Sequence, residues 1–466
     1  MRPIILLILI LSYHGINGQL PNIPQRPGAS SLYSVPDNRF ANTQPSRPGF
    51  PTINSNVNHY KSVTPRDDQQ EINKMVEHQM AMIREEADAK RYNLSPLSDK
   101  KGTDAYYRAY DNLLKLDPNQ YTLADAVFIV ENAYNNNDRN FQASYQQHIQ
   151  KATSIIRQDI KKTGIDESDN AAKNLSIFKY FAEDTKQNGK VIHKAVKYDF
   201  DDYMGAKDYS KMFVSKLLKS NSGQCHSMPL LYLILAEQIG AEAFLVMSPN
   251  HSYIRFKDND GEVLSVELTN GMFSANSFVL NSGYIKAEAL KNKLYMQNLT
   301  KKDVLSQTYV DLASGYIHKF GYDEFVAKVL AKALEFNPNN INATLWKSNT
   351  DQMRFMQACN RLGIDPEDKQ QLQNIRNYPP LENQFLGIKA GFDYIDRSGF
   401  AQMPPEQYEE WLGSLKSTEN KQKSEEIAER VRLLNAQKKL EAAQKTKTIT
   451  PKKESPKVYT IPKEFL

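Results

Sequence analysis

Apolar residues recur every three or four positions through the early and late parts of the chain, and this interval predicts amphipathic helices. Between residues 104 and 118, Tyr107, Tyr110 and Leu113 carry the interval, and the Asp-Pro-Asn sequence from Asp117 ends it. Neighbouring stretches repeat the pattern. The sequence therefore predicts a helical lobe over residues 66–165 and a second helical region over residues 301–415.

The middle of the chain, residues 166–300, combines helical stretches with two β-type runs, parts of which alternate apolar and polar residues as half-buried strands do. These runs are residues 244–256 and 262–270, and the residues between them have the composition of a hairpin turn. We therefore predict an α+β protein whose central domain contains a small antiparallel sheet.

Alternation also assigns side chains to the two faces of this hairpin. His251, Tyr253 and Arg255 share one face of the first strand, and Glu267 lies on the polar face of the second. Direct pairing of His251 with Glu267 requires a turn with an odd number of residues, such as 258–260, or a bulge. A two-residue turn would place Glu267 on the wrong face.

The ends of the chain have a different character. The first residues, MRPIILLILILSYHGING, join a positive start to a short apolar run, which predicts a secretory signal peptide over residues 1–18. Residues 19–65 are rich in Pro, Asn, Ser and Gln and predict a disordered linker. Residues 416–466 predict a charged helix and a flexible tail. These features predict a secreted or periplasmic protein with no transmembrane segment after signal removal.

Composition narrows the class of partner. The net charge is only +5, and much of the excess lies in the lysine-rich C-terminus, so nucleic-acid binding is not predicted. The chain has two cysteines, Cys225 and Cys359, which could form one disulfide in an exported protein. Against this, Cys359 lies in a helical stretch where a small core residue is expected. No metal site is predicted, because Cys225 and His226 have no further Cys or His at ligand spacing. No cofactor is predicted, because the sequence has no nucleotide or flavin motif.

Cys225 stands where a reactive thiol is favoured, between a small-residue turn and a long apolar helix. Unpaired N–H groups and the helix dipole stabilise a thiolate at a helix start. A catalytic thiol also needs a base and a group that orients the base. His226 is poorly placed to serve, because adjacent helical residues point about 100° apart. His251 and Glu267 are the better partners, although each residue alone is more often structural.

Three stretches, GQCHSMPLLY from Gly223, PNHSYIRF from Pro249 and VELT from Val266, resemble the cysteine, histidine and acidic motifs of the transglutaminase-like superfamily. They are most similar to the bacterial branch that joins such a domain to tetratricopeptide-type helices. The resemblance implies a papain-like fold and acyl transfer on peptide or amide bonds by Cys225, His251 and Glu267.

Two residues depart from the pattern of this superfamily. Glu267 stands where true transglutaminases usually have Asp. Pro229 removes one hydrogen bond from the helix that follows Cys225, so this helix is expected to start later or to tilt.

The late helices leave two functions open. Residues 333–340, ALEFNPNN, resemble the close of a tetratricopeptide unit, and Ala327, Ala331 and Ala333 are small enough to let paired helices approach closely. One to two units are visible, fewer than a free-standing solenoid needs. The protein is then either an exported cysteine enzyme, hydrolase or transferase, with a protein or peptide substrate, or a catalytically silent fold. The silent fold would act as a scaffold that holds a protein partner on its TPR-like helices.

Overall fold

The computed structural model describes residues 65–164, 166, 168–258, 260–274, 280, 284–401 and 403–414, and single positions between 425 and 440. The predicted signal peptide, the predicted linker up to residue 64 and nearly all of the predicted charged helix and tail lie outside these residues. Within the described part of the chain, no helix is both long and apolar enough to cross a bilayer.

The described residues form two compact units. The first unit comprises residues 96–351 and 387–414, and the second comprises residues 65–95 and 352–386. In the first unit the helices before the sheet are α3 (Thr103–Leu114), α4 (Leu123–Tyr134), α5 (Arg139–Thr163), α6 (Asn170–Ala182), η2 (Tyr209–Met212), α7 (Val214–Ser220) and α8 (Ser227–Ile239). After the sheet come α10 (Ala287–Lys291), α11 (Lys301–Phe320), α12 (Glu324–Phe336) and α15 (Pro405–Ser414).

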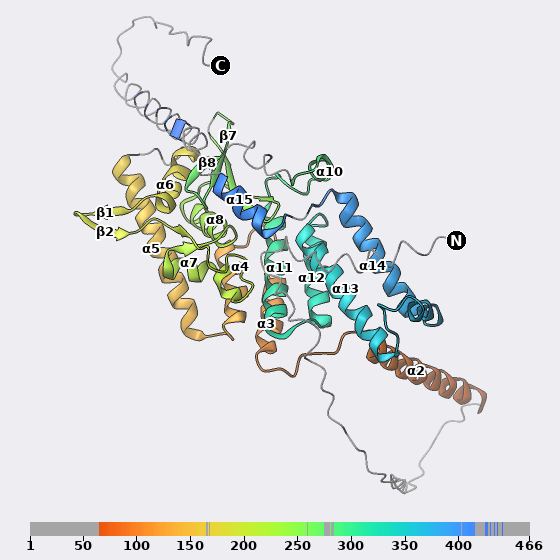
Figure 1. Cartoon of the computed structure of the whole chain (residues 1–466). Coiled ribbons are helices and arrows are strands. Elements are labelled where there is room, and N and C mark those ends of the chain that lie inside the picture. Colours follow the sequence, from red (N-terminus) through yellow and green to blue (C-terminus); the bar gives the residue numbers. More distant parts are fainter. Residues whose placement is uncertain are drawn as a thin grey trace, which may run out of the picture. The chain divides into compact units, whose positions relative to one another are not determined.

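The second unit contains α2 (Pro65–Tyr92) and η3 (Gln371–Asn377). Two long helices, α13 (Ile341–Arg361) and α14 (Pro379–Ser398), contribute residues to both units. Helices dominate the molecule, and short strands make up the rest of its regular structure, so the predicted α+β class is confirmed at this level (Figure 1).

The largest sheet is antiparallel and has the order β5-β6-β7-β8. Its strands are β5 (Phe244–Ser248), β6 (His251–Lys257), β7 (Val263–Glu267) and β8 (Met272–Ser274). Smaller pairs are β1 (Thr185–Gln187) with β2 (Lys190–His193), and β3 (Lys197–Tyr198) with β4 (Ser222–Gly223).

The first predicted run is two strands rather than one. It breaks at Pro249 and Asn250, and Asn250 has a left-handed backbone with φ 55°. Proline followed by a left-handed residue is the pattern of a type II turn. Ser248 therefore pairs directly with His251, which places the histidine at the very start of β6.

The loop between β6 and β7 has an odd number of residues, as the hairpin prediction required. Lys257 pairs with Val263, so the loop is residues 258–262 rather than 258–260. The side chain of Asp258 organises it by accepting hydrogen bonds from the backbone N–H groups of Asp260 and Glu262. The longer loop shifts the register, so Tyr253, not His251, lies opposite Glu267. His251 and Glu267 lie on the same face of the sheet, as predicted, but the predicted direct pairing between them is wrong.

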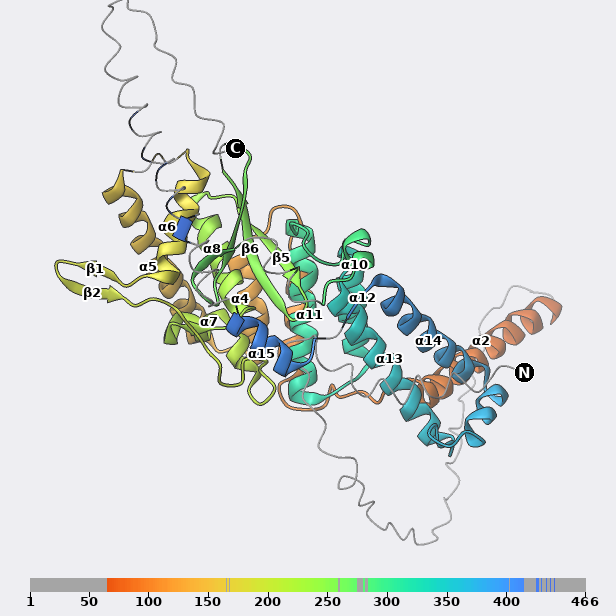
Figure 2. The same cartoon turned by 45° about the horizontal axis from the view of Figure 1, so that its top comes forward.

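Helix α8 forms the centre of the first unit. Its residues 227–236 are all buried, and it packs against β5 and β6 and against α4, α5, α6 and α7 (Figures 1 and 2). A helix that is apolar on every side needs such a complete covering. The residues just before it are therefore held on a rigid support.

Helices α11 and α12 form the predicted pair. α11 begins with a capping box, in which the Thr300 and Asp303 side chains bond to each other's backbone N–H groups. Ala333 is buried, and its carbonyl accepts a hydrogen bond from Ser306 of α11. Ala331 is exposed, so the small-residue role predicted for it is wrong.

Candidate functional site

Cys225 lies just before the central helix. α8 begins at Ser227 with His226 as its N-cap, so the helix starts two residues after Cys225, as Pro229 led us to expect. The N–H of Met228 donates to the carbonyl of Gln224 at 3.0 Å and the N–H of Leu230 donates to the carbonyl of His226 at 3.4 Å, whereas Pro229 has no N–H for the carbonyl of Cys225. The predicted loss of one helical hydrogen bond at Pro229 therefore occurs.

The approach to Cys225 requires a residue without a side chain. A Cβ atom on Gly223 would lie 2.4 Å from Cδ1 of Leu217 and 2.8 Å from Oγ of Ser227. Gly223 also pairs in parallel with Tyr198 of β3. This close packing fixes the backbone that carries the thiol and brings Tyr198 into its neighbourhood.

The three residues singled out in the sequence meet in the structure. Nε2 of His251 lies 2.5 Å from Oε2 of Glu267. Oε1 of Glu267 accepts hydrogen bonds from the backbone N–H of Thr269 at 2.9 Å and from its hydroxyl at 2.6 Å. The exposed fractions of Cys225, His251 and Glu267 are 4%, 3% and 2%. A solvated Glu267, the structural alternative for that residue, is therefore excluded.

Cys225 is held from two sides. Its Sγ lies 3.6 Å from the backbone oxygen of Asn250, and its own carbonyl accepts a hydrogen bond from the Ser252 hydroxyl at 2.5 Å. Because Glu267 engages Nε2 of His251, the imidazole can act on the thiol only through Nδ1, which also lies 3.2 Å from the Tyr408 hydroxyl. The turn before β6 thus holds the nucleophile and the base together.

The electrostatics favour an ion pair. Burial raises the pKa of the Cys225 thiol, but hydrogen bonding to His251 and the charges of His251 and His226 outweigh burial and leave this pKa below its ordinary value. Burial lowers the pKa of His251, but the charge of Glu267 and hydrogen bonds to Cys225 and Glu267 raise it to about 10. Burial raises the pKa of Glu267, as it does for Cys225, but the charge of His251 and the hydrogen bond to it bring the pKa of Glu267 below its ordinary value. The arrangement is an imidazolium between a thiolate and a carboxylate.

His226 lines the pocket beside the thiol and has its own partner. Its Nε2 lies 3.3 Å from Oδ2 of Asp311 on α11. Burial lowers the pKa of His226, but the adjacent Asp311 carboxylate outweighs burial and raises it. The contact with Asp311, from a distant part of the sequence, therefore favours a positive charge on His226 near the thiol.

Helix α15, drawn in blue in Figures 1 and 2, supplies residues that the sequence did not reveal. Tyr408 is fully buried, and its hydroxyl lies 3.2 Å from Nδ1 of His251 and 3.3 Å from the Tyr198 hydroxyl. The Trp411 ring packs edge-on to His251, with the ring centroids 5.1 Å apart. The only sequence signal is the three-residue spacing of these aromatic side chains. This spacing predicts an apolar helix face but does not indicate which part of the protein that face packs against.

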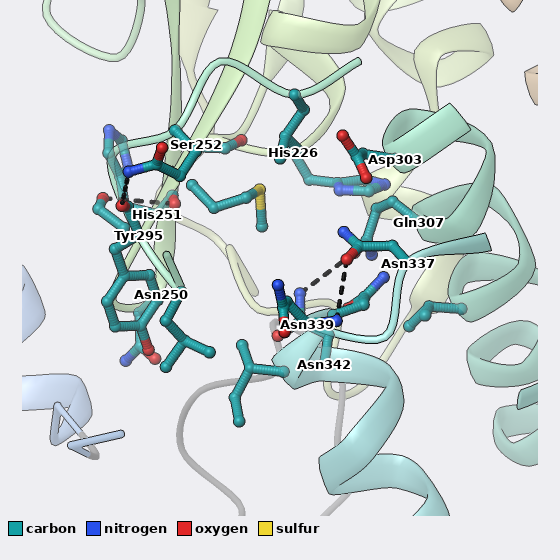
Figure 3. A pocket seen from close by; sticks show the side chains of 18 of the residues that line it. His226, Asn250, His251, Ser252, Tyr295, Asp303, Gln307, Asn337, Asn339 and Asn342 are labelled. Carbon is teal, nitrogen blue, oxygen red and sulfur yellow. Dashed lines mark hydrogen bonds between the residues drawn. The ribbon is translucent and has the colours of Figure 1, made fainter. Parts of the chain in front are cut away.

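A pocket opens beside the thiol on another side (Figure 3). Cys225 and His251 line it together with the turn before β6, residues 293–299, α11 and the start of α13. Its volume is about 200 Å³. Cys225 therefore borders a space that small reagents can enter without passing through α15.

Both cysteines are free thiols, so the possible disulfide does not form. Burial raises the pKa of Cys359 to about 12, which makes it an unreactive core residue. Within the described part of the chain, no group of three or more His, Cys, Asp and Glu side chains is arranged to hold a metal ion.

Comparison of the chain with protein-family models, curated proteins and solved structures gives no match.

Proposed function

We propose that this chain is an exported, transglutaminase-like cysteine enzyme that transfers acyl groups from peptide or amide bonds. Its triad would be Cys225, His251 and Glu267, carried on a papain-like core within residues 166–300. The observation that supports this proposal is the buried His251 imidazole, which Glu267 holds at Nε2 and which lowers the pKa of the Cys225 thiol. The secreted or periplasmic location rests on the predicted signal peptide alone.

The reaction follows from this charge arrangement. The Cys225 thiolate attacks the carbonyl carbon, and backbone N–H groups near the start of α8 stabilise the oxyanion. The C–N bond then breaks, and His251 gives its proton to the leaving amine. Water or a second amine attacks the resulting thioester, His251 takes the proton of that nucleophile, and the thiolate leaves. Glu267 keeps the imidazole oriented throughout.

The alternative is a catalytically silent fold that holds a protein partner on its late helices. Enclosure of the thiol favours this alternative, because Tyr408 and Trp411 cover the site from the side of α15. An enzyme would need its substrate to enter through the pocket in Figure 3, or α15 to move.

Thiol reactivity distinguishes the two functions. Iodoacetamide should alkylate Cys225 rapidly at pH 7, well below the ordinary thiol pKa of about 8.5. His251→Ala should slow this reaction at least about tenfold, because the thiolate loses its counter-charge. His148→Ala on α5 is a matched control and should change nothing. A slow reaction that does not depend on His251 would reject the enzyme.

A further inference from the structure

The pocket beside Cys225 has a lining rich in carboxamides that come from separate segments. Asn250 belongs to the β5–β6 turn, Gln307 to α11, and Asn337, Asn340 and Asn342 to the connection into α13 and its first turn. Figure 3 shows Asn250 and His251 on one side of the pocket and Gln307, Asn337 and Asn342 on the other. Each carboxamide offers both a donor and an acceptor without a net charge.

The carboxylates in the lining are already occupied. Asp311 pairs with His226 and also accepts a hydrogen bond from Gln307 at 3.2 Å. Asp303 accepts a hydrogen bond from the Thr300 hydroxyl at 2.6 Å. Lys293 lies at the exposed edge. Asp303 and Lys293 keep their charges, but Asp303 is only half-buried and Lys293 is exposed. A charged ligand group in the interior of the pocket would therefore lose its hydration without gaining a buried counter-charge, which is costly.

Two of the carboxamides are bonded to each other and so form a fixed wall. Nδ2 of Asn342 donates to Oε1 of Gln307 at 3.3 Å, and both side chains are buried. Asn340 is fixed in the same wall by hydrogen bonds with Ser306 and with the backbone of Ala343. The wall is preorganised, so a ligand that matches it meets little ordering cost.

Asn250, which lines the pocket beside the thiol, has one buried acceptor without a partner. Its Nδ2 donates to the carbonyl of Met403 at 2.7 Å, whereas Oδ1 is buried and has no partner among the described residues. The residue is 5% exposed, precedes His251, and its carbonyl oxygen lies near the thiol. An unmatched buried acceptor costs about 1–3 kcal/mol, and a turn of this side chain toward a ligand N–H or O–H group in the pocket would remove that cost.

We infer that this pocket selects acyl donors in which the residue bearing the transferred carbonyl has an uncharged, hydrogen-bonding side chain. Glutamine, asparagine, serine and threonine have this chemistry. An aliphatic side chain would leave the carboxamides unmatched, and a charged one would lack a counter-charge. The inference rests on the proposed function, because it requires that Cys225 attack an acyl group.

Short peptides that end in a chloromethyl ketone test this selectivity. The thiolate forms a C–S bond and chloride leaves, so the rate of Cys225 modification can be followed by intact mass. Five probes would differ only at the residue that bears the ketone: Gln, Ser, Glu, Lys and Leu. The Gln and Ser probes should react at least about tenfold faster than the others, as expected for a site that hydrogen-bonds its ligand.

A paired substitution locates the selectivity. Gln307→Leu combined with Asn342→Leu replaces both partners of one hydrogen bond, which is better tolerated than losing one of them. It should reduce the preference for Gln over Leu to about twofold or less. Gln158→Leu, at an exposed position of α5, makes the same chemical change elsewhere and should keep the wild-type preference.

The outcomes separate this inference from the function on which it rests. If iodoacetamide fails to react with Cys225 in a His251-dependent way, the proposed function falls and the inference falls with it. If that reaction is fast but the Leu, Glu or Lys probe is the fastest, or no peptide probe reacts, the inference alone is overturned.

Discussion

The hydroxyl of Tyr408 lies 3.2 Å from Nδ1 of His251, at the ring nitrogen that Glu267 does not engage. Tyr408 belongs to the last described helix of the first unit, and His251 begins a strand of the central sheet. The base of the proposed triad is thus held by hydrogen bonds at both ring nitrogens, one to each of two distant parts of the chain.

Tyr408→Phe should make the thiol less acidic. Burial raises the pKa of Cys225, and His251 and then the hydrogen bond from Tyr408 lower it below its ordinary value. Loss of the Tyr408 hydrogen bond should therefore raise the pKa of Cys225. The pH profile of iodoacetamide alkylation measures this change. Tyr394→Phe, at a residue that is 40% exposed on α14, is the control. An unchanged profile for Tyr408→Phe would show that its hydroxyl does not act on the thiol.

Glu267→Gln should lower the nucleophilicity of Cys225 at neutral pH. Without the carboxylate the pKa of His251 falls, and the imidazolium that stabilises the thiolate is lost. Alkylation at pH 7 should slow by about tenfold or more. Glu262→Gln, on the exposed loop of the same hairpin, should react like the wild type. Equal rates for Glu267→Gln and the wild type would remove Glu267 from the triad.

The buried pair of His251 and Glu267 predicts how the stability of the protein depends on pH. The pKa of His251 is raised from 6.5 to about 10, so its contribution is complete below pH 6.5 and is lost as the pH rises through about 10. The pKa of Glu267 is lowered from 4.5, so its contribution is present above pH 4.5 and is lost as the pH falls through the lowered value. The difference in the free energy of unfolding between wild type and Glu267→Gln should therefore be largest between pH 4.5 and pH 6.5.

Removing one member of a buried ion pair costs about 3–5 kcal/mol, which gives the expected size of this difference. Urea unfolding at pH 5.5, 8 and 10 measures it. A difference that stays constant over this range would mean that His251 is not charged in the folded protein.

Gly399→Ala should destabilise the connection that leads to α15. Gly399 has φ 86°, and a Cβ atom there would lie 2.3 Å from the backbone N of Ala289 and 2.8 Å from the carbonyl carbon of Glu288. Strain of this kind costs about 1–3 kcal/mol. Gly413→Ala in α15 meets no atom within 4 Å and should be neutral or stabilising by up to about 1 kcal/mol. Thermal melting of the two variants makes the comparison, and equal melting temperatures would contradict it.

The alternation of apolar and polar residues was sufficient to predict the relative placement of the two site residues that lie on one hairpin. Period-two alternation placed His251 and Glu267 on the same side, because side-chain direction depends on the parity of the loop and not on its length. The register itself escaped prediction, since it depends on the loop that Asp258 closes with hydrogen bonds.

Contacts between distant segments of the chain could not be predicted from the sequence. Asp311 reaches His226 from α11, and Tyr408 reaches His251 from α15. Neither contact has a local period or spacing that marks it. Pro229 indicated that the helix after Cys225 starts late, but the sequence does not show which of Cys225, His226 and Ser227 takes the first helical backbone angles.

Placement of the aromatic cover at the end of the chain has a consequence for biosynthesis. Cys225, His251 and Glu267 emerge from the ribosome close together, whereas Tyr408 and Trp411 follow only after helices α11 to α14 have been made. A nascent chain therefore passes through a stage in which the nucleophile already has its base but still lacks its cover. A product terminated before residue 405 would remain at that stage permanently.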